Sequence, residues 1–212
     1  STTGKPDSTG SVGTAVEGAI KEVSELLDKL VKAVKTAEGA SSGTDAIGEV
    51  VANDAAKAAD KDSVKGIAKG IKEIVEAAGG SEKLKAVAAA AGESNKKAGK
   101  LFGKVGDDAG AGDSEAASKA AGAVSAVSGE QILSAIVKAA GAADQEGKKP
   151  ADATNPIAAA IGDKDGDAEF GDGMKKDDQI AAAIALRGMA KDGKFAVKGN
   201  EKGKAEGAIK GA

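Results

Sequence analysis

The 212-residue chain contains no cysteine, histidine, tryptophan or tyrosine, and only three phenylalanines. Without cysteine it can form no disulfide and offers no thiolate for catalysis or for zinc. Without histidine it lacks the commonest general base and metal ligand. With so few aromatic rings, it has almost nothing on which nucleic-acid bases could stack. These absences predict a protein that is not an enzyme and that holds no cofactor and no metal ion.

The chain also has little net charge and no long apolar run. Lys and Arg number 30 and Asp and Glu 33, so the net charge is only −3. The sequence shows no basic stripe, which argues against a nucleic-acid partner. The longest apolar run, 180–186, is far too short to span a membrane. Residues 1–11 show no signal-peptide pattern. The length fits a single domain over residues 1–212.

Small residues dominate what is present. Glycine occurs 31 times, alanine is still more frequent, and Leu, Ile, Val and Phe make up roughly 17% of the chain. Alanine is the best helix former but buries little area per residue. The sequence therefore predicts an all-α fold, a multi-helix bundle of short Ala-rich helices with long polar loops and at most a few very short strands.

The clearest helix signal follows a flexible Ser/Thr/Gly-rich lead-in at residues 1–11. Its apolar residues are spaced 4-3-4-3-4, which is a heptad pattern: Val16, Ile20, Val23, Leu27, Leu30 and Val34. The stripe is expected either to pack on its own chain or to form an intermolecular coiled coil, and the first reading is preferred.

Further elements follow from apolar spacing and capping residues. Ser128 with Gln131 predicts a capping box, and Asn155 before Pro156 predicts a helix start. Gly66 and Gly70, one turn apart, would allow a close helix neighbour. Helices are expected over 44–59, 62–78, 81–91, 96–102, 113–128, 129–140, 156–162, 177–189 and 201–212, with a short strand over 194–198.

The motifs that could carry chemistry fail on inspection. Residues 188–194 begin like a phosphate-binding loop, but Phe195 replaces the required Ser or Thr. The acidic loop at 163–167 opens like an EF-hand, but the sixth and twelfth positions are Ala168 and Met174. The paired carboxylates 107–108 and 177–178 are interpreted as solvated faces or helix caps.

Residues 174–198, MKKDDQIAAAIALRGMAKDGKFAVK, closely resemble the immunodominant invariant segment of the VlsE-type variable surface lipoproteins of Lyme-disease spirochaetes, the variable major protein-like family. The resemblance continues through 17–44, 63–88, 113–137 and 155–165, and so covers nearly the whole chain. The sequence EGAIK occurs twice, at 17–21 and 206–210. This repeat is similar to the short direct repeats that flank the family's expression cassette. The resemblance is to the cassette region of the family and does not include the family's invariant N- and C-terminal parts.

The resemblance implies a non-enzymatic outer-surface antigen that works by antigenic variation and immune evasion. It implies host antibodies as partners, and an extracellular position on the outer membrane through a lipid anchor outside this sequence. The segments expected to vary lie at 45–62, 89–100, 104–112, 138–154, 166–173 and 199–203. The antibody-reactive residues expected by resemblance are Met174, Lys175, Lys176, Asp177, Asp178, Gln179, Ile180, Arg187, Lys191, Asp192, Lys194, Phe195 and Lys198. Because 180–189 is apolar on every side, we expect most of this segment to be buried.

Two other functions remain open at this stage. An adhesin for host matrix or glycosaminoglycan would need a cationic cluster, and the candidates are Lys83, Lys85, Lys96, Lys97 and Lys100. A self-associating coat protein would use the heptad stripe of the first helix. A monomer or weak dimer is expected.

Overall fold

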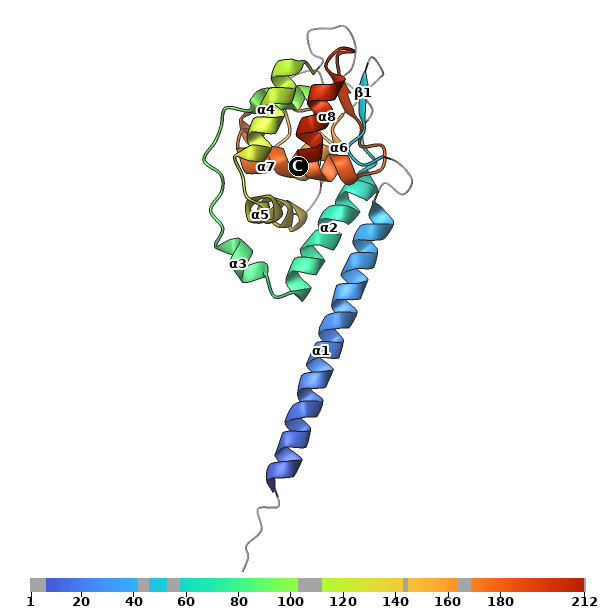
Figure 1. Cartoon of the computed structure of the whole chain (residues 1–212), viewed down its shortest axis with the longest axis vertical. Helices are drawn as coiled ribbons and strands as arrows, with labels where there is room; N and C mark the ends of the chain where they lie inside the picture. Colours follow the sequence, from blue (N-terminus) through green and yellow to red (C-terminus); the bar gives the residue numbers. More distant parts are fainter. Residues whose placement is uncertain are drawn as a thin grey trace, which may run out of the picture.

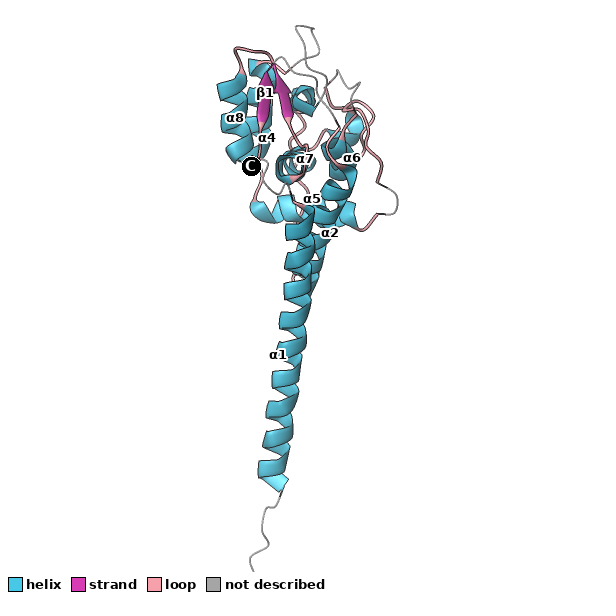
Figure 2. Cartoon of the chain, turned by 90° about the vertical axis from the view of Figure 1, so that its right-hand side faces the viewer, coloured by secondary structure: helices cyan, strands magenta, loops and turns pink. Residues whose placement is uncertain are grey.

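A long N-terminal helix extends from a globular body that contains all the other elements (Figure 1). The computed structural model describes residues 7–41, 46–52, 58–102, 112–142, 145–163 and 169–211. Turning the molecule by 90° shows the same elongated shape, with the free end of the helix far from the body (Figure 2). The predicted all-α class is confirmed.

The first helix, α1 (Asp7–Ala40), begins inside the stretch that was expected to be a flexible lead-in. Its C-terminal part packs on α2 (Lys61–Ala77) through small residues. A Cβ atom built on Gly70 would lie 2.7 Å from the Ala37 backbone nitrogen, and one built on Gly66 would overlap Ala40. The predicted close neighbour of these two glycines is therefore α1.

The heptad stripe of α1 does not face α2. Ile20 is 64% exposed, and four other residues of the stripe are also exposed: Val16, Val23, Leu27 and Val34. Leu30 is half-buried. The prediction that the stripe packs on its own chain is thus wrong for the described residues, because the packing face is made of Ala33, Ala37 and Ala40 instead.

Residues 46–52 are not helical, although a helix was expected over 44–59. Strand β1 (Val50–Ala52) pairs in parallel with β2 (Phe195–Val197), and Val50 lies opposite Phe195. The β-branched pair Val50 and Val51 favours a strand, and Gly48 has a φ of 69°, which breaks a helix. Residues 42–45 and 53–57 lie outside the described part. The strand expected over 194–198 is confirmed as β2.

Helices with strong caps lie where they were predicted. Asp113 caps α4 (Ser114–Ser125), the capping box of Ser128 and Gln131 begins α5 (Gly129–Ala140), and Asn155 caps α6 (Pro156–Ile161). Gly162 ends α6 with a φ of 70°, a left-handed conformation that favours glycine. The other short elements are α3 (Ser81–Lys85), the 3₁₀ helices η1 (Lys96–Phe102) and η2 (Asp172–Met174), and α8 (Lys202–Gly211).

The helix expected over 81–91 is shorter than predicted, since α3 ends at Lys85. Residues 86–95 follow as an irregular segment that runs along the outer side of the body (Figure 1). We call residues 86–95 the strap. Its course could not be read from the run of alanines, which favours helix.

Helix α7 (Asp177–Met189) lies in the centre of the body and belongs to both apolar clusters of the core. On one side Ile180 and Ile184 pack in a cluster with the three phenylalanines. On the other side Leu186 joins residues of α2, α5 and α6. In the described part, no single helix is long and apolar enough to cross a membrane, and the one jointly apolar pair, α4 with α5, is bent by 99°.

Candidate functional site: the central helix and its cover

Helix α7 is buried because small side chains let neighbouring elements approach it from all sides. Ala181, Ala182 and Ala183 are completely inaccessible, as are Ile180 and Ile184. The structure confirms the expectation of burial derived from the all-round apolar pattern. Most of the segment singled out by resemblance is therefore interior.

The two carboxylates at the start of α7 are buried and neither is the N-cap, so the expectation of solvated faces or helix caps is wrong for this pair. Asp177 is 3% and Asp178 6% exposed. The Asn95 side chain donates from Nδ2 to Asp177 Oδ1 at 2.7 Å, and the Ala90 amide donates to Asp178 Oδ2 at 3.3 Å. The two acids lie in the first turn, where the helix dipole favours negative charge. The N-cap is Lys176, without a side-chain cap.

Arg187 is the largest fully buried side chain and joins three parts of the body. Its Nε donates to the Lys194 carbonyl at 3.0 Å, and its Nη1 donates to the carbonyls of Ala160 and Ile161 at 2.9 and 3.1 Å. Its guanidinium carbon is 5.9 Å from the ring centroids of both Phe102 and Phe195. Burial lowers the pKa of Arg187 to about 10. It remains charged at neutral pH and ties α7 to α6 and β2.

The thirteen antibody-reactive residues expected by resemblance fall into three groups by exposure. Six are buried: Met174, Asp177, Asp178, Ile180, Arg187 and Phe195. Four are half-buried: Lys175, Lys176, Gln179 and Lys198; three are exposed: Lys191, Asp192 and Lys194. The exposed ones form the turn after α7, where Asp192 has a φ of 59°. The segment thus offers half-buried lysines near its start, an exposed turn after α7 and a buried middle.

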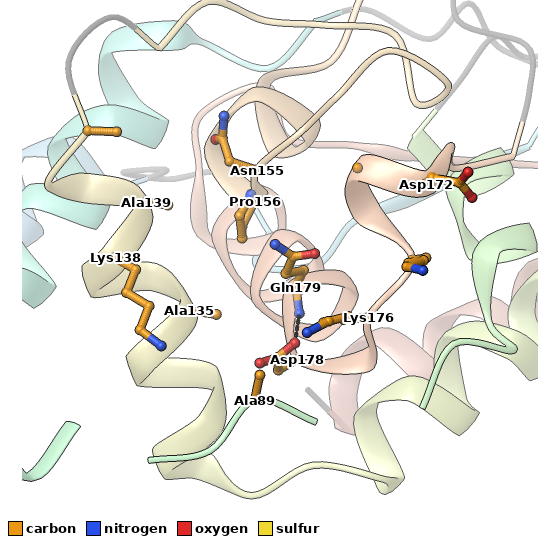
Figure 3. A pocket seen from close by; sticks show the side chains of 13 residues that line it. Ala89, Ala135, Lys138, Ala139, Asn155, Pro156, Asp172, Lys176, Asp178 and Gln179 are labelled. Atoms are coloured by element: carbon orange, nitrogen blue, oxygen red, sulfur yellow. Dashed lines mark hydrogen bonds between the residues drawn. The ribbon is translucent and has the colours of Figure 1, made fainter. Parts of the chain in front are cut away.

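A pocket of about 480 Å³ lies at the N-terminal end of the segment. Figure 3 shows Lys176, Asp178 and Gln179 of this segment on one side and Lys138 of α5 on the other. Ala89 of the strap also lines the pocket. Asp178 and Gln179, in the first turn of α7, line it.

The motifs that were considered for metal or phosphate binding do not form a site in the described residues. No group of three or more acidic residues that could hold a metal ion exists in the described ranges, and 164–168 of the acidic loop lie outside them. Where a phosphate loop was considered, α7 ends at Met189 and a turn leads into β2, as the helix-stop reading predicts. The carboxylate pair 107–108 also lies outside the described residues.

Three of the five lysines considered for an adhesin belong to separate ion pairs; of the other two, Lys83 is exposed and Lys100 half-buried. Lys85 pairs with Glu82 at 2.7 Å, Lys96 with Asp172 at 3.0 Å and Lys97 with Glu115 at 2.7 Å. The hydrogen bond that Lys97 donates to Glu115 raises the pKa of Lys97. Carboxylates beside these lysines offset the positive potential that a polyanion site needs.

Sequence reasoning missed Gly92 and Asn95, which hold the strap on α7. A Cβ atom on Gly92 would overlap the Asp177 carboxylate. Nothing in the local pattern marks these residues, because their partners lie more than 80 positions away along the chain.

Comparison with known proteins places the chain in a family. The family described as Borrelia lipoprotein matches residues 2–212. Two Borrelia hermsii proteins match: Variable large protein 17 at 40% identity over 189 residues, and Variable large protein 4 at 39% over 191 residues. These matches cover 88% and 86% of this chain but 53% and 52% of the relatives, so the chain spans about half of their length.

A solved relative shares the fold. The crystal structure of the Lyme disease variable surface antigen VlsE of Borrelia burgdorferi is 87% identical, with a TM-score of 0.88, over 93% of this chain and 73% of that one. The relatives are variable surface proteins, not enzymes. The chain therefore belongs to the Borrelia lipoprotein family, as a VlsE-type surface lipoprotein.

Proposed function

We propose that this chain is an outer-surface antigen whose helical scaffold presents substitutable loops and hides a constant helix, α7, from antibodies. The observation that carries the proposal is the burial of α7 at the centre of the body. A segment on which α2, α4, α5 and α6 all pack cannot change without loss of the fold. Concealment is then the way in which it escapes recognition.

The polar segments expected to vary supply the complementary feature. Four of the five residues at 199–203 are exposed, as are Lys148, Lys149, Ala151 and Asp152 in the segment 138–154. Exposed loops tolerate substitution far better than packed helices do. Substitutions at these exposed positions would alter the surface while leaving the two clusters around α7 intact.

We also propose that the parent protein carries a lipid anchor in the outer membrane and displays this domain on the extracellular face. The family description as a lipoprotein supports the anchor. Helix α1 would hold the body away from the membrane, since its 34 residues extend about 51 Å and its N-terminal end is the part farthest from the body (Figure 2).

A competition experiment tests concealment. An antibody raised against the peptide 174–198 is bound to immobilised peptide, and free peptide or intact folded protein competes. If opening the segment costs 3 kcal/mol or more, intact protein should compete about 100-fold more weakly than free peptide.

An antibody against the exposed face of α1, residues 17–32, serves as the matched control. It should bind intact protein and peptide equally, because that stretch is exposed except at Leu30. Equal competition by intact protein and peptide in the 174–198 assay would refute concealment.

A further inference from the structure

The strap, residues 86–95, lies across the N-terminal end of α7 and is held there by contacts that involve few side chains. The Gly92 carbonyl accepts a hydrogen bond from the Asp177 amide at 3.1 Å. This amide is the first of α7 and has no acceptor within its own helix. The strap therefore supplies part of the cap that Lys176 does not provide.

Two further contacts join the strap to the buried carboxylates. Asn95 donates to Asp177 at 2.7 Å, and the Ala90 amide donates to Asp178 at 3.3 Å. Ala90 and Asn95 are both buried, at 6% and 7% exposure. Gly92 packs so closely on Asp177 that a side chain there would overlap the carboxylate.

The other end of the strap is fixed to α5. Gln131 donates to the Ala88 carbonyl at 3.2 Å, and Ser134 donates to the carbonyl of Leu84, just before the strap, at 3.1 Å. The strap thus bridges α5 and α7 beside the pocket of Figure 3, where Ala89 lies next to Asp178.

We propose that the strap is a latch: its contacts through Ala90, Gly92 and Asn95 keep the N-terminal half of the antibody-reactive segment closed. Opening the strap widens the neighbouring pocket onto the first turns of α7. The proposal rests on the proposed function and adds the residues that control access.

The latch also divides a segment that is expected to vary by resemblance. Ala89, Ala91 and Ser94 are exposed and can change without moving the strap. Glu93 is also exposed but pairs with Lys175 at 3.2 Å. Gly92 and Asn95 cannot, because any replacement disturbs the carboxylate of Asp177. The structure therefore predicts fixed positions within an otherwise substitutable stretch.

Hydrogen exchange of intact protein, followed at the amides of 177–181, measures the latch directly. In Gly92→Ala and in Asn95→Ala, these amides should exchange at least about tenfold faster. In the first variant the Asp177 amide loses its acceptor, the Gly92 carbonyl, and in the second the Asp177 carboxylate loses the Asn95 amide. The matched controls are Ala91→Ser, which likewise adds one heavy atom, and Ser94→Ala. Both should exchange as the parent chain does.

Coupling between Gly92 and Asp177 provides a second measurement that remains informative if one variant folds poorly. If Gly92 acts through the carboxylate, the variant carrying both Gly92→Ala and Asp177→Ala should exchange no faster than Asp177→Ala alone. Unchanged exchange in both single variants, or fully additive effects in the double variant, would overturn the latch.

Binding of the anti-peptide antibody to the same variants separates the latch from the proposed function. Faster exchange with at least about tenfold tighter antibody binding supports both, since the apparent affinity scales with the open fraction. Faster exchange without tighter binding supports the latch and counts against concealment as the function. Tighter binding with unchanged exchange at 177–181 overturns the latch.

Discussion

Replacing Arg187 by Met tests the idea that a buried cation, more than apolar contact alone, holds the core together. Met keeps the unbranched apolar part of the side chain but removes every donor. The guanidinium donates three hydrogen bonds to carbonyls and lies 5.9 Å from two phenylalanine rings. At about 1.5 kcal/mol for each charged hydrogen bond and about 2 kcal/mol for the ring contacts, these interactions stabilise the fold by roughly 6 kcal/mol.

Desolvation opposes this gain. Burial lowers the pKa of Arg187 to about 10. At about 1.36 kcal/mol for each pKa unit, this lowering corresponds to a cost of roughly 3 kcal/mol for keeping the charge in the core. Arg187→Met recovers this cost but leaves the Lys194 and Ala160 carbonyls short of a donor. We therefore expect a net loss of about 3 kcal/mol in the free energy of unfolding.

Urea denaturation followed by circular dichroism at neutral pH measures this loss. Arg187→Lys should also be destabilised, because one ammonium cannot reproduce the planar fork that reaches carbonyls of two different segments. Lys191→Met, on the exposed turn of the same segment, should stay within about 0.5 kcal/mol of the parent chain. An Arg187→Met variant as stable as the parent would refute the reasoning.

Three further predictions concern the scaffold. In Gly70→Ala the new methyl group meets Ala37, so we expect a loss of about 1–3 kcal/mol in urea, whereas Gly18→Ala, with open space around it, should be neutral or stabilising. Residues 7–29 of α1, which are exposed wherever their side chains are described, should show much lower hydrogen-exchange protection than Ala33 to Ala40. The hydrogen bond that Asp113 accepts from the Ala116 amide lowers the pKa of Asp113, so the charged cap stabilises α4 above the unfolded pKa of 3.8. This stabilisation is lost as the pH falls through the folded pKa. On acidification below about pH 5, the melting temperature of Asp113→Asn should therefore fall less than that of the parent chain.

The sequence predicted those elements whose signals are local. Three helix caps form where the sequence indicates them: at Asp113, at Ser128 with Gln131, and at Asn155 with Pro156. They could be predicted because a cap depends on residues no more than about three positions apart. The burial of 180–186 was also predictable, since apolar residues on every side leave no face for water. The class of the protein followed from long motifs and from the absence of reactive side chains.

Errors occurred where a partner distant in the chain decides the structure. Val50 and Val51 form a strand because β2 lies beside them, although residues 44–59 contain enough alanine to favour a helix. Residues 86–91 leave the helical path because Asp177 and Asp178 bind the strap. The same two acids were expected at the surface, since an acidic pair carries no local sign of the Asn95 amide that binds it.

The stripe on α1 shows why spacing alone cannot assign a packing face. A heptad pattern identifies an amphipathic helix but does not say which side meets the body. Close approach to Gly66 and Gly70 requires small residues, so α1 turns Ala37 and Ala40 toward α2 and leaves Ile20 and Leu27 exposed. The same rule governs α7, where alanines let five helices converge on one axis. In this family fold, small residues decide which surfaces meet, and larger apolar residues fill the space that remains.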